Sequence, residues 1–265
     1  MKIIYFIIGV AIAVFLGTLF SLFYRTNAAS IVVPSGLIGY WRLNEGSAST
    51  TQDLSGSNLP GTLGNFGGPA AAWTTSRVGL SNAIDFDGVN DIIDVPGDTY
   101  DNMGEITVSA WIKPDGYGEG NRGRVVDKAN GTAPTNGWIF NMTNGVANAI
   151  IFLLDGSTDL NLRSSADAVP FGVWTHVAVT WNGNATCSGN AIIYINGVAN
   201  TVCNANLVSR TSDAAETLKI GNDKSFVRTF DGIIDDVRVY NRALSATEIQ
   251  RLYSLRNLGG QGISR

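Results

Sequence analysis

Near its C-terminus the chain reads Phe230-Asp231-Gly232-Ile233-Ile234-Asp235-Asp236-Val237-Arg238-Val239-Tyr240-Asn241-Arg242-Ala243-Leu244-Ser245. Ile233, Val237 and Val239 recur at even spacing, which predicts a strand with one apolar face. The same spacing places Asp235 on that face, where a carboxylate is costly unless it is paired, hydrogen-bonded or bound to a metal ion. Residues 245–248 (Ser-Ala-Thr-Glu) have the form of a capping box, so a short helix over 245–254 is expected to follow.

Strand patterns precede this stretch along most of the chain. Between Glu105 and Pro114, polar and apolar residues alternate, with Ile106, Val108, Ala110 and Ile112 on one side. About twelve short strands, separated by Gly, Asn and Asp turns, predict an all-β, two-sheet antiparallel sandwich of the jelly-roll kind. The chain contains 31 glycines, which suits many tight turns.

Composition bounds the organisation and the partners. A chain of 265 residues can hold one large β domain, and no change of composition divides residues 35–254, which are therefore expected to form one domain. Residues 255–265 are expected to be a flexible tail. The formal net charge is −4 and no basic cluster is present, so nucleic acid is not an expected partner.

The N-terminus predicts the location of the protein. Residues 3–24 are uncharged, and about 20 apolar residues span a bilayer as a helix. We therefore expect residues 1–30 to be a membrane anchor, with the domain on the outside of the cell envelope. The alternative is a signal peptide cleaved at the small residues 26–30, which would make the protein secreted.

Two cysteines fit an oxidising compartment. Cys187 and Cys203 flank an apolar segment with Asn196-Gly197, a strong hairpin signal. A two-residue turn there pairs residues whose numbers sum to 393, which places Cys203 opposite Asn190 and close to Cys187. A disulfide between Cys187 and Cys203 is therefore predicted, and two free buried thiols are the alternative.

Several stretches resemble the laminin-G-like, concanavalin A-like lectin and glucanase superfamily, to which pentraxins are related. The resemblance rests on the C-terminal stretch above and on segments 39–46, 83–95, 106–114, 174–181 and 194–197. It implies a jelly-roll domain used mostly for binding and adhesion, and less often for catalysis. Relatives of this fold often hold a structural calcium ion.

Acidic side chains suggest where such an ion would bind. Asp87 and Asp91 lie in an oxygen-rich turn, and Asp235 could close the site from a neighbouring strand, since calcium takes carboxylate and carbonyl oxygens. The alternative is that Asp87 belongs to a plain turn and that Asp235 pairs with an arginine such as Arg238 or Arg242.

Carbohydrate is the expected ligand. Trp73 and Tyr117 lie in loop sequences and are candidate platforms for sugar rings, although they could instead cap the core. The single histidine, His176, lies within a strand pattern and is expected to be structural. No strand carries the paired carboxylates of a glycoside hydrolase, so the protein is not expected to be an enzyme. The expected function is a non-catalytic module that binds carbohydrate or a surface glycoprotein. A structural protein–protein module and a divergent glycoside hydrolase are the alternatives.

Overall fold

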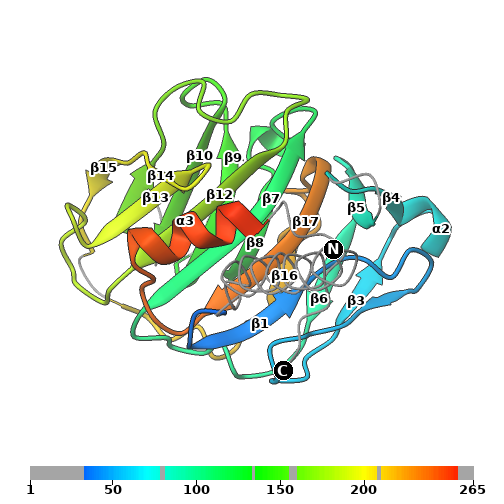
Figure 1. Cartoon of the computed structure of the whole chain (residues 1–265), viewed down its shortest axis with the longest axis horizontal. Helices are drawn as coiled ribbons and strands as arrows, with labels where there is room; N and C mark the ends of the chain where they lie inside the picture. Colours follow the sequence, from blue (N-terminus) through cyan, green and yellow to red (C-terminus); the bar gives the residue numbers. More distant parts are fainter. Residues whose placement is uncertain (1–32, 78–80, 133–134, 155–159, 208–209, 256–265) are drawn as a thin grey trace, which may run out of the picture. The chain divides into compact units, whose positions relative to one another are not determined.

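Seventeen strands pair into two antiparallel sheets that form a sandwich (Figure 1). The computed structural model describes residues 33–77, 81–132, 135–154, 160–207 and 210–255. From Pro34 onward these residues belong to one compact unit. The predicted all-β, two-sheet antiparallel architecture is confirmed. The strands outnumber the expected twelve because several have only two to four residues, too few to show an alternating pattern.

The two sheets are named A and B. Sheet A has the order β14-β13-β12-β7-β17-β5-β4, with β1 paired to β17, and sheet B has the order β15-β11-β10-β9-β8-β16-β6-β3-β2. The strands of sheet A are β1 (Leu37–Trp41), β4 (Trp73–Thr75), β5 (Asn82–Asp87), β7 (Ile106–Pro114), β12 (Thr175–Trp181), β13 (Ala191–Ile195), β14 (Val198–Ala199) and β17 (Asp231–Tyr240). Those of sheet B are β2 (Thr50–Thr51), β3 (Gly61–Gly64), β6 (Ile92–Val95), β8 (Arg124–Ala129), β9 (Gly137–Thr143), β10 (Ala149–Leu154), β11 (Leu160–Arg163), β15 (Val202–Ala205) and β16 (Leu218–Ile220).

The main core lies between the sheets. The apolar positions of β7, namely Ile106, Val108, Ala110 and Ile112, are all buried in it, as their alternation predicts. Sheet B contributes Val126, Phe140, Phe152 and Leu162 from four neighbouring strands. Burial of this apolar surface is the main force that holds the sheets together.

A β-bulge in β17 overturns one sequence prediction. The register of β17 against β7 shifts between Asp235 and Arg238, and Asp236 adopts a positive φ of 59°. The bulge changes which residues face inward: Ile234, Val237 and Val239 lie in the core, whereas Asp235 does not. Asp235 was expected on the apolar face. That expectation is wrong, because one extra residue reverses the alternation on one side of the bulge.

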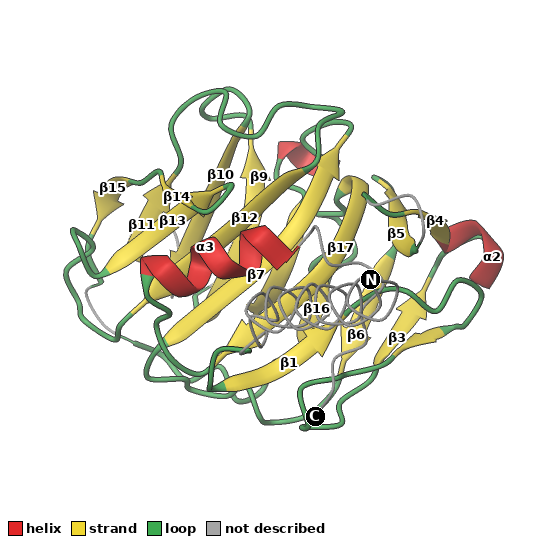
Figure 2. Cartoon of the chain, viewed as in Figure 1, coloured by secondary structure: helices red, strands yellow, loops and turns green. Residues whose placement is uncertain are grey.

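The helix α3 (Ala246–Ser254) lies across sheet A over β12 and β13 (Figure 1). It begins at the predicted capping box: Ser245 Oγ accepts from the Glu248 backbone N–H, and the Glu248 carboxylate accepts from the Ser245 N–H. Ile249 and Leu252 pack on Ala178 and Tyr194. Two shorter helices were not predicted, α2 (Pro69–Ala72) and the 3₁₀ turn η1 (Glu119–Asn121), the short red segment in the upper part of Figure 2.

The predicted hairpin and disulfide both form, but Cys203 does not lie on the hairpin strand that was expected to carry it. Tyr194 pairs with Ala199 and Ile195 with Val198, which is the predicted register. The chain then leaves sheet A, and β15 pairs with β11 in sheet B. Cys203 lies on β15 and forms a disulfide with Cys187, with a Cα–Cα distance of 5.8 Å.

Three predictions fall outside the described residues. Residues 3–24, the possible cleavage segment 26–30 and most of the tail at 255–265 lie there. No helix within the described ranges is long and apolar enough to cross a membrane. The bounds expected for the domain, 35–254, stay a prediction.

Candidate functional site

Several loops converge at one end of the sandwich, where β5 and β7 end and β17 begins (Figure 1). Backbone hydrogen bonds join them: Gly88 N–H to Phe230 O (3.1 Å), Asp115 N–H to Asp231 O (2.9 Å), Glu119 N–H to Thr229 O (2.9 Å) and Gly172 N–H to Pro114 O (2.7 Å). We call this end, formed by residues 87–91, 115–123, 164–174 and 221–230, the loop end. Its loops are fixed to one another through backbone groups, so their side chains have defined positions.

Exposed apolar side chains gather on these loops. Eight large apolar residues are exposed in the described part of the chain, and five of them lie at the loop end. These are Val89 (59% exposed), Phe171 (38%), Val173 (50%), Phe226 (46%) and Val227 (38%). A cluster of exposed apolar side chains commonly marks a site of interaction.

Tyr117 belongs to this cluster. Its ring meets Phe171 edge-to-face, with the ring centroids 4.9 Å apart. The Tyr117 hydroxyl oxygen accepts from the Asn148 backbone N–H at 3.4 Å. Tyr117 is half-buried and Phe171 lies further out, so the pair presents an aromatic surface with one polar edge.

Trp73 lies elsewhere. It opens β4, pairs with Ile84 of β5 and packs against the main core. Its indole N–H donates to Ala48 O at 3.0 Å. The structure therefore does not bring Trp73 and Tyr117 together, and the position of Trp73 corresponds to core capping.

Acidic side chains crowd the region of the Asp87–Asp91 turn. Asp91 Oδ2 accepts from the Asp87 backbone N–H at 2.9 Å, and Asp87 Oδ1 accepts from the Val89 N–H at 2.8 Å. Burial raises the pKa of Asp91 to about 6. Burial, followed by repulsion from Asp115, also raises the pKa of Asp231. The two aspartates predicted from the turn thus lie together, but their carboxylates cap the backbone of the turn.

Asp235 is not part of this group. It lies opposite Trp111, whereas Asp231, four residues earlier on β17, is the partner of Asp87. Asp235 Oδ2 accepts from Arg77 Nη1 at 2.9 Å, and Asp236 pairs with both Arg77 (3.1 Å) and Arg238 (2.9 Å). The arginine pairing weighed in the sequence analysis therefore occurs, with Arg77 as the partner of Asp235.

The predicted calcium set does not fit the structure. Asp87, Asp91 and Asp235 do not converge, because the bulge turns Asp235 away and Arg77 neutralises it. Within the described residues, no group of three or more His, Cys, Asp or Glu side chains is arranged to hold a metal ion. Calcium binding stays an expectation, for which the described residues supply no set of ligands.

His176 lies on the outer face of sheet A, opposite Trp111. It is fully buried, and this burial lowers its pKa to about 3, so the ring is neutral at ordinary pH. Its ring lies 5.3 Å from that of Trp111 and 6.1 Å from that of Tyr253, measured between centroids. These contacts agree with the structural role expected for it.

Several residues of the loop end escaped the sequence analysis. Phe171 and Phe226 stand in short loop sequences without periodicity, Val169-Pro170-Phe171-Gly172 and Asp223-Lys224-Ser225-Phe226-Val227. An aromatic residue flanked by Gly, Asp or Ser was the only available signal. Phe171 and Phe226 lie at the same end of the sandwich because the sheet topology brings their loops together.

Comparison with known proteins agrees with the architecture. A family model described as concanavalin A-like lectin/glucanases superfamily matches residues 87–250. No curated protein matches the chain.

Solved structures share the fold at low identity. The binding domain of botulinum neurotoxin serotype D is 17% identical with a TM-score of 0.58, and the match covers 84% of this chain and 52% of that one. Trypanosoma rangeli sialidase is 16% identical with a TM-score of 0.58, over 85% of this chain and 34% of the sialidase. Domain 4 of AbnA, an extracellular arabinanase from Geobacillus stearothermophilus in complex with arabinotriose, is 20% identical with a TM-score of 0.54, over 82% and 98%. The chain spans about half the length of the toxin binding domains that it matches.

Proposed function

Because the chain belongs to the concanavalin A-like lectin/glucanases superfamily, we propose that it is a non-catalytic module that binds carbohydrate or a glycosylated surface through the loop end. The observation that carries this proposal is the gathering of five of the eight exposed large apolar residues on these loops. Sugar rings have apolar faces that stack on aromatic side chains, and Tyr117 with Phe171 offers such a surface. The Asp and Asn groups beside the pair could hydrogen-bond to sugar hydroxyls.

Two features of the fold relatives support this proposal. The toxin matches are binding domains by name, and the arabinanase domain is described with arabinotriose bound. The sialidase carries less weight in this proposal, because the match covers only 34% of that chain. The non-catalytic role rests on the sequence, in which no strand carries the carboxylate pair of a glycoside hydrolase.

A protein partner is the second candidate. Three of the five exposed side chains are valines, Val89, Val173 and Val227, and these stack on sugars less well than aromatic rings do. An aliphatic surface of this kind suits contact with another protein. In that case the module would assemble or space other proteins of the cell envelope.

We also propose that the domain works outside the cell, anchored by residues 3–24. The disulfide between Cys187 and Cys203 supports an oxidising compartment. Membrane fractionation and protease treatment of intact cells would test this. Protection of the domain from external protease would contradict it.

The binding proposal is tested with the purified full chain and a glycan panel that includes arabinotriose. Tyr117→Ala and Phe171→Ala should each weaken glycan binding by roughly tenfold, which corresponds to ~1.4 kcal/mol. Val198→Ala is the matched control, since Val198 is 65% exposed and lies on β14, outside the loop end. Turnover of any glycan would favour the hydrolase. Binding of envelope proteins alone would favour the protein module.

A further inference from the structure

Three arginines gather where the loop 221–230 meets β8. Arg124 opens β8, and its backbone N–H donates to Arg228 O at 2.9 Å. Arg122 and Arg228 both lie close enough to act electrostatically on Arg124. The guanidinium of Arg228 lies against Gly120, where even a Cβ atom would be 2.1 Å from its Nη1. Because Gly120 has no side chain, the Arg228 guanidinium can occupy the space beside it.

Arg124 is the buried member of this group. It is fully buried, with Nε 2.9 Å from Asp127 Oδ2 and with Asp223 also nearby. Its guanidinium nitrogens have no hydrogen-bond partner of good geometry in the described residues. Burial raises the pKa of Asp127 to about 7, and the charge of Arg124 acts against this rise. Arg124 therefore belongs to a buried charge cluster with Asp127 and Asp223, and of the three arginines only Arg122 and Arg228 reach the surface.

The two outer arginines have no carboxylate partner among the described residues. Arg122 is exposed and Arg228 is half-buried, and neither forms an ion pair in the described residues. Arg228 Nη1 donates to the backbone oxygen of Val227 at 2.8 Å. Glu119, which lies on the same loop as Arg122, accepts from Thr229 Oγ1 at 3.5 Å through its Oε2. Free guanidinium groups in this position suit an anionic partner.

Phe226 stands two residues from Arg228 in a strained conformation. It is 46% exposed, and its φ is 58°, which a bulky residue rarely adopts. Asp223 fixes the turn: its Oδ1 accepts from the Ser225 and Val227 N–H groups, both at 3.1 Å, and its O accepts from Phe226 N–H at 3.2 Å. Strain of this kind that holds an aromatic ring towards solvent points to a function of the ring.

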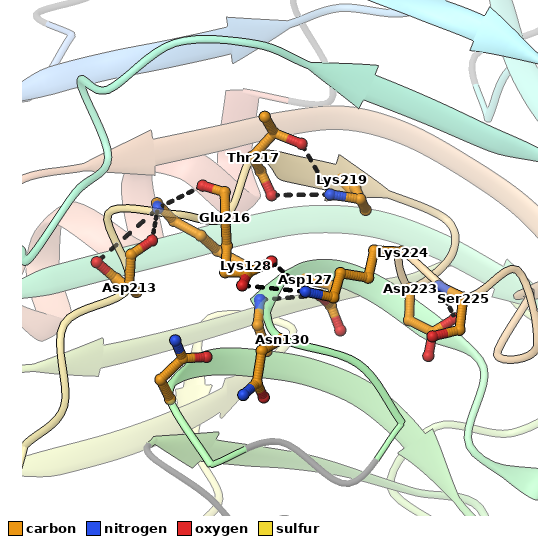
Figure 3. A network of polar contacts seen from close by, with 12 residues as sticks. Asp127, Lys128, Asn130, Asp213, Glu216, Thr217, Lys219, Asp223, Lys224 and Ser225 are labelled. Atoms are coloured by element: carbon orange, nitrogen blue, oxygen red, sulfur yellow. Dashed lines mark hydrogen bonds and ion pairs between the residues drawn. The ribbon is translucent and has the colours of Figure 1, made fainter.

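The tip of this loop is held from its other side as well. Figure 3 shows the hydrogen bond between Asp223 and Ser225, and the contact of the neighbouring Lys224 with Glu216. Lys224 Nζ lies 2.9 Å from Glu216 Oε2, so this cation is already paired. In the described part of the chain, Arg122 and Arg228 thus remain without an ion pair, and Phe226 is the exposed aromatic ring of the loop 221–230.

We propose that Phe226, Arg122 and Arg228 form a subsite for a sugar that carries a carboxylate, such as a hexuronate. The apolar face of the sugar ring stacks on Phe226, and the guanidinium groups hold the carboxylate. The proposal rests on the carbohydrate-binding function proposed above and adds the class of sugar. The Asp-rich region near Tyr117, with Asp85, Asp87, Asp115 and Asp231, repels such a group, so the acidic sugar binds on the arginine side of the loop end.

The test compares an oligogalacturonate with a neutral galacto-oligosaccharide of equal length, using the full chain and isothermal titration calorimetry. The oligogalacturonate should bind at least about tenfold more tightly. Raising the salt from about 0.05 M to about 0.5 M should remove most of that difference, because salt screens exposed charges. Arg228→Gln and Arg122→Gln should each weaken binding of the acidic oligomer and leave the neutral one unchanged. Arg251→Gln is the control, since Arg251 is an exposed arginine on α3.

Phe226→Gly separates a binding role from a structural one. Glycine adopts a positive φ without strain, so this variant should keep or raise the melting temperature. It should nevertheless weaken binding of the acidic oligomer by several-fold. A preference for the neutral oligomer, or equal affinity for both, would overturn the subsite and leave the carbohydrate function standing. No binding to any sugar would overturn both. Free sulfate that competes equally well in wild type and Phe226→Gly would show a simple anion site and also overturn the assignment.

Discussion

At the scale of single residues, the bulge in β17 controls how four charges are arranged. Asp236 has a positive φ, which allows Asp235 and Asp236 to reach Arg77 together while Asp236 also reaches Arg238. Burial works against the charged form of Asp236, yet Arg238 and Arg77 hold its pKa below its usual range. These four residues therefore act as one paired network on the outer face of sheet A.

Loss of one charge from this network should be costly. Asp236→Asn leaves Arg238 buried without its main partner, and an unpaired buried charge typically costs ~3 kcal/mol or more. We expect the free energy of unfolding in urea to fall by about that amount. Asp85→Asn is the control, since the Asp85 side chain is exposed. No loss is expected there, and an equal loss in both variants would contradict the network.

The same arrangement predicts how Asp235 responds to calcium. Asp235 is paired with Arg77 and lies apart from Asp87 and Asp91. Asp235→Asn should therefore lower the melting temperature by the same amount in calcium and in a chelator. Differential scanning fluorimetry measures this directly. A calcium-dependent stabilisation that disappears in Asp235→Asn would restore the three-aspartate site expected from the sequence.

At the scale of elements, the sequence predicted correctly those structures that depend on a short local pattern. The alternation in β7, the Asn196–Gly197 turn and the capping box of α3 all depend on neighbours within a few residues. The bulge at Asp235 could not be inferred in this way, because a bulge has no alternation of its own. The crossing of β15 to sheet B likewise depends on pairing with β11, a partner 40 or so residues earlier in the chain.

The start of α3 gives a prediction that depends on pH. The Glu248 carboxylate accepts from Arg242 Nη1 at 3.1 Å and from the Ser245 N–H at 2.8 Å. Hydrogen bonding with Arg242 is the main cause that lowers the pKa of Glu248 to about 2. A carboxylate with a lowered pKa contributes stability above its unfolded pKa, and this is lost as the pH falls through the folded value. We expect the contribution to disappear between about pH 4.5 and about pH 2.

Glu248→Gln tests this assignment. Stability curves measured by urea unfolding at a series of pH values should be lower for the variant at pH 7. The two curves should converge as the pH approaches 2, where the wild-type carboxylate is protonated. Ser254→Ala, in the last turn of the same helix, should shift the curve equally at every pH. A constant gap between Glu248→Gln and wild type would show that Glu248 acts through something other than its charge.

At the scale of the whole molecule, the candidate site is assembled by topology. Tyr117, Phe171, Phe226 and Arg228 come from three separate loops that meet because β7, β12 and β17 are neighbours in sheet A. Their types were visible in the sequence, but their neighbourhood required the strand order. This explains why Tyr117 was identified from its loop sequence alone, whereas Phe171 and the arginines near Phe226 were not.

The disulfide acts at this same scale, because it links the two sheets. Cys187 lies just before β13 of sheet A, and Cys203 lies on β15 at the edge of sheet B. Cys203→Ser should therefore lower the free energy of unfolding by about 3 kcal/mol, the value typical of a closed loop of this length. It should also free β15 from β11, since β15 has only four residues. Hydrogen exchange should show faster exchange of the backbone amides of β15 in the variant, with β7 and β12 at the centre of sheet A unchanged. Uniformly faster exchange would mean that the bond supports the whole sandwich, and unchanged exchange at β15 would mean that the pairing with β11 holds this edge without it.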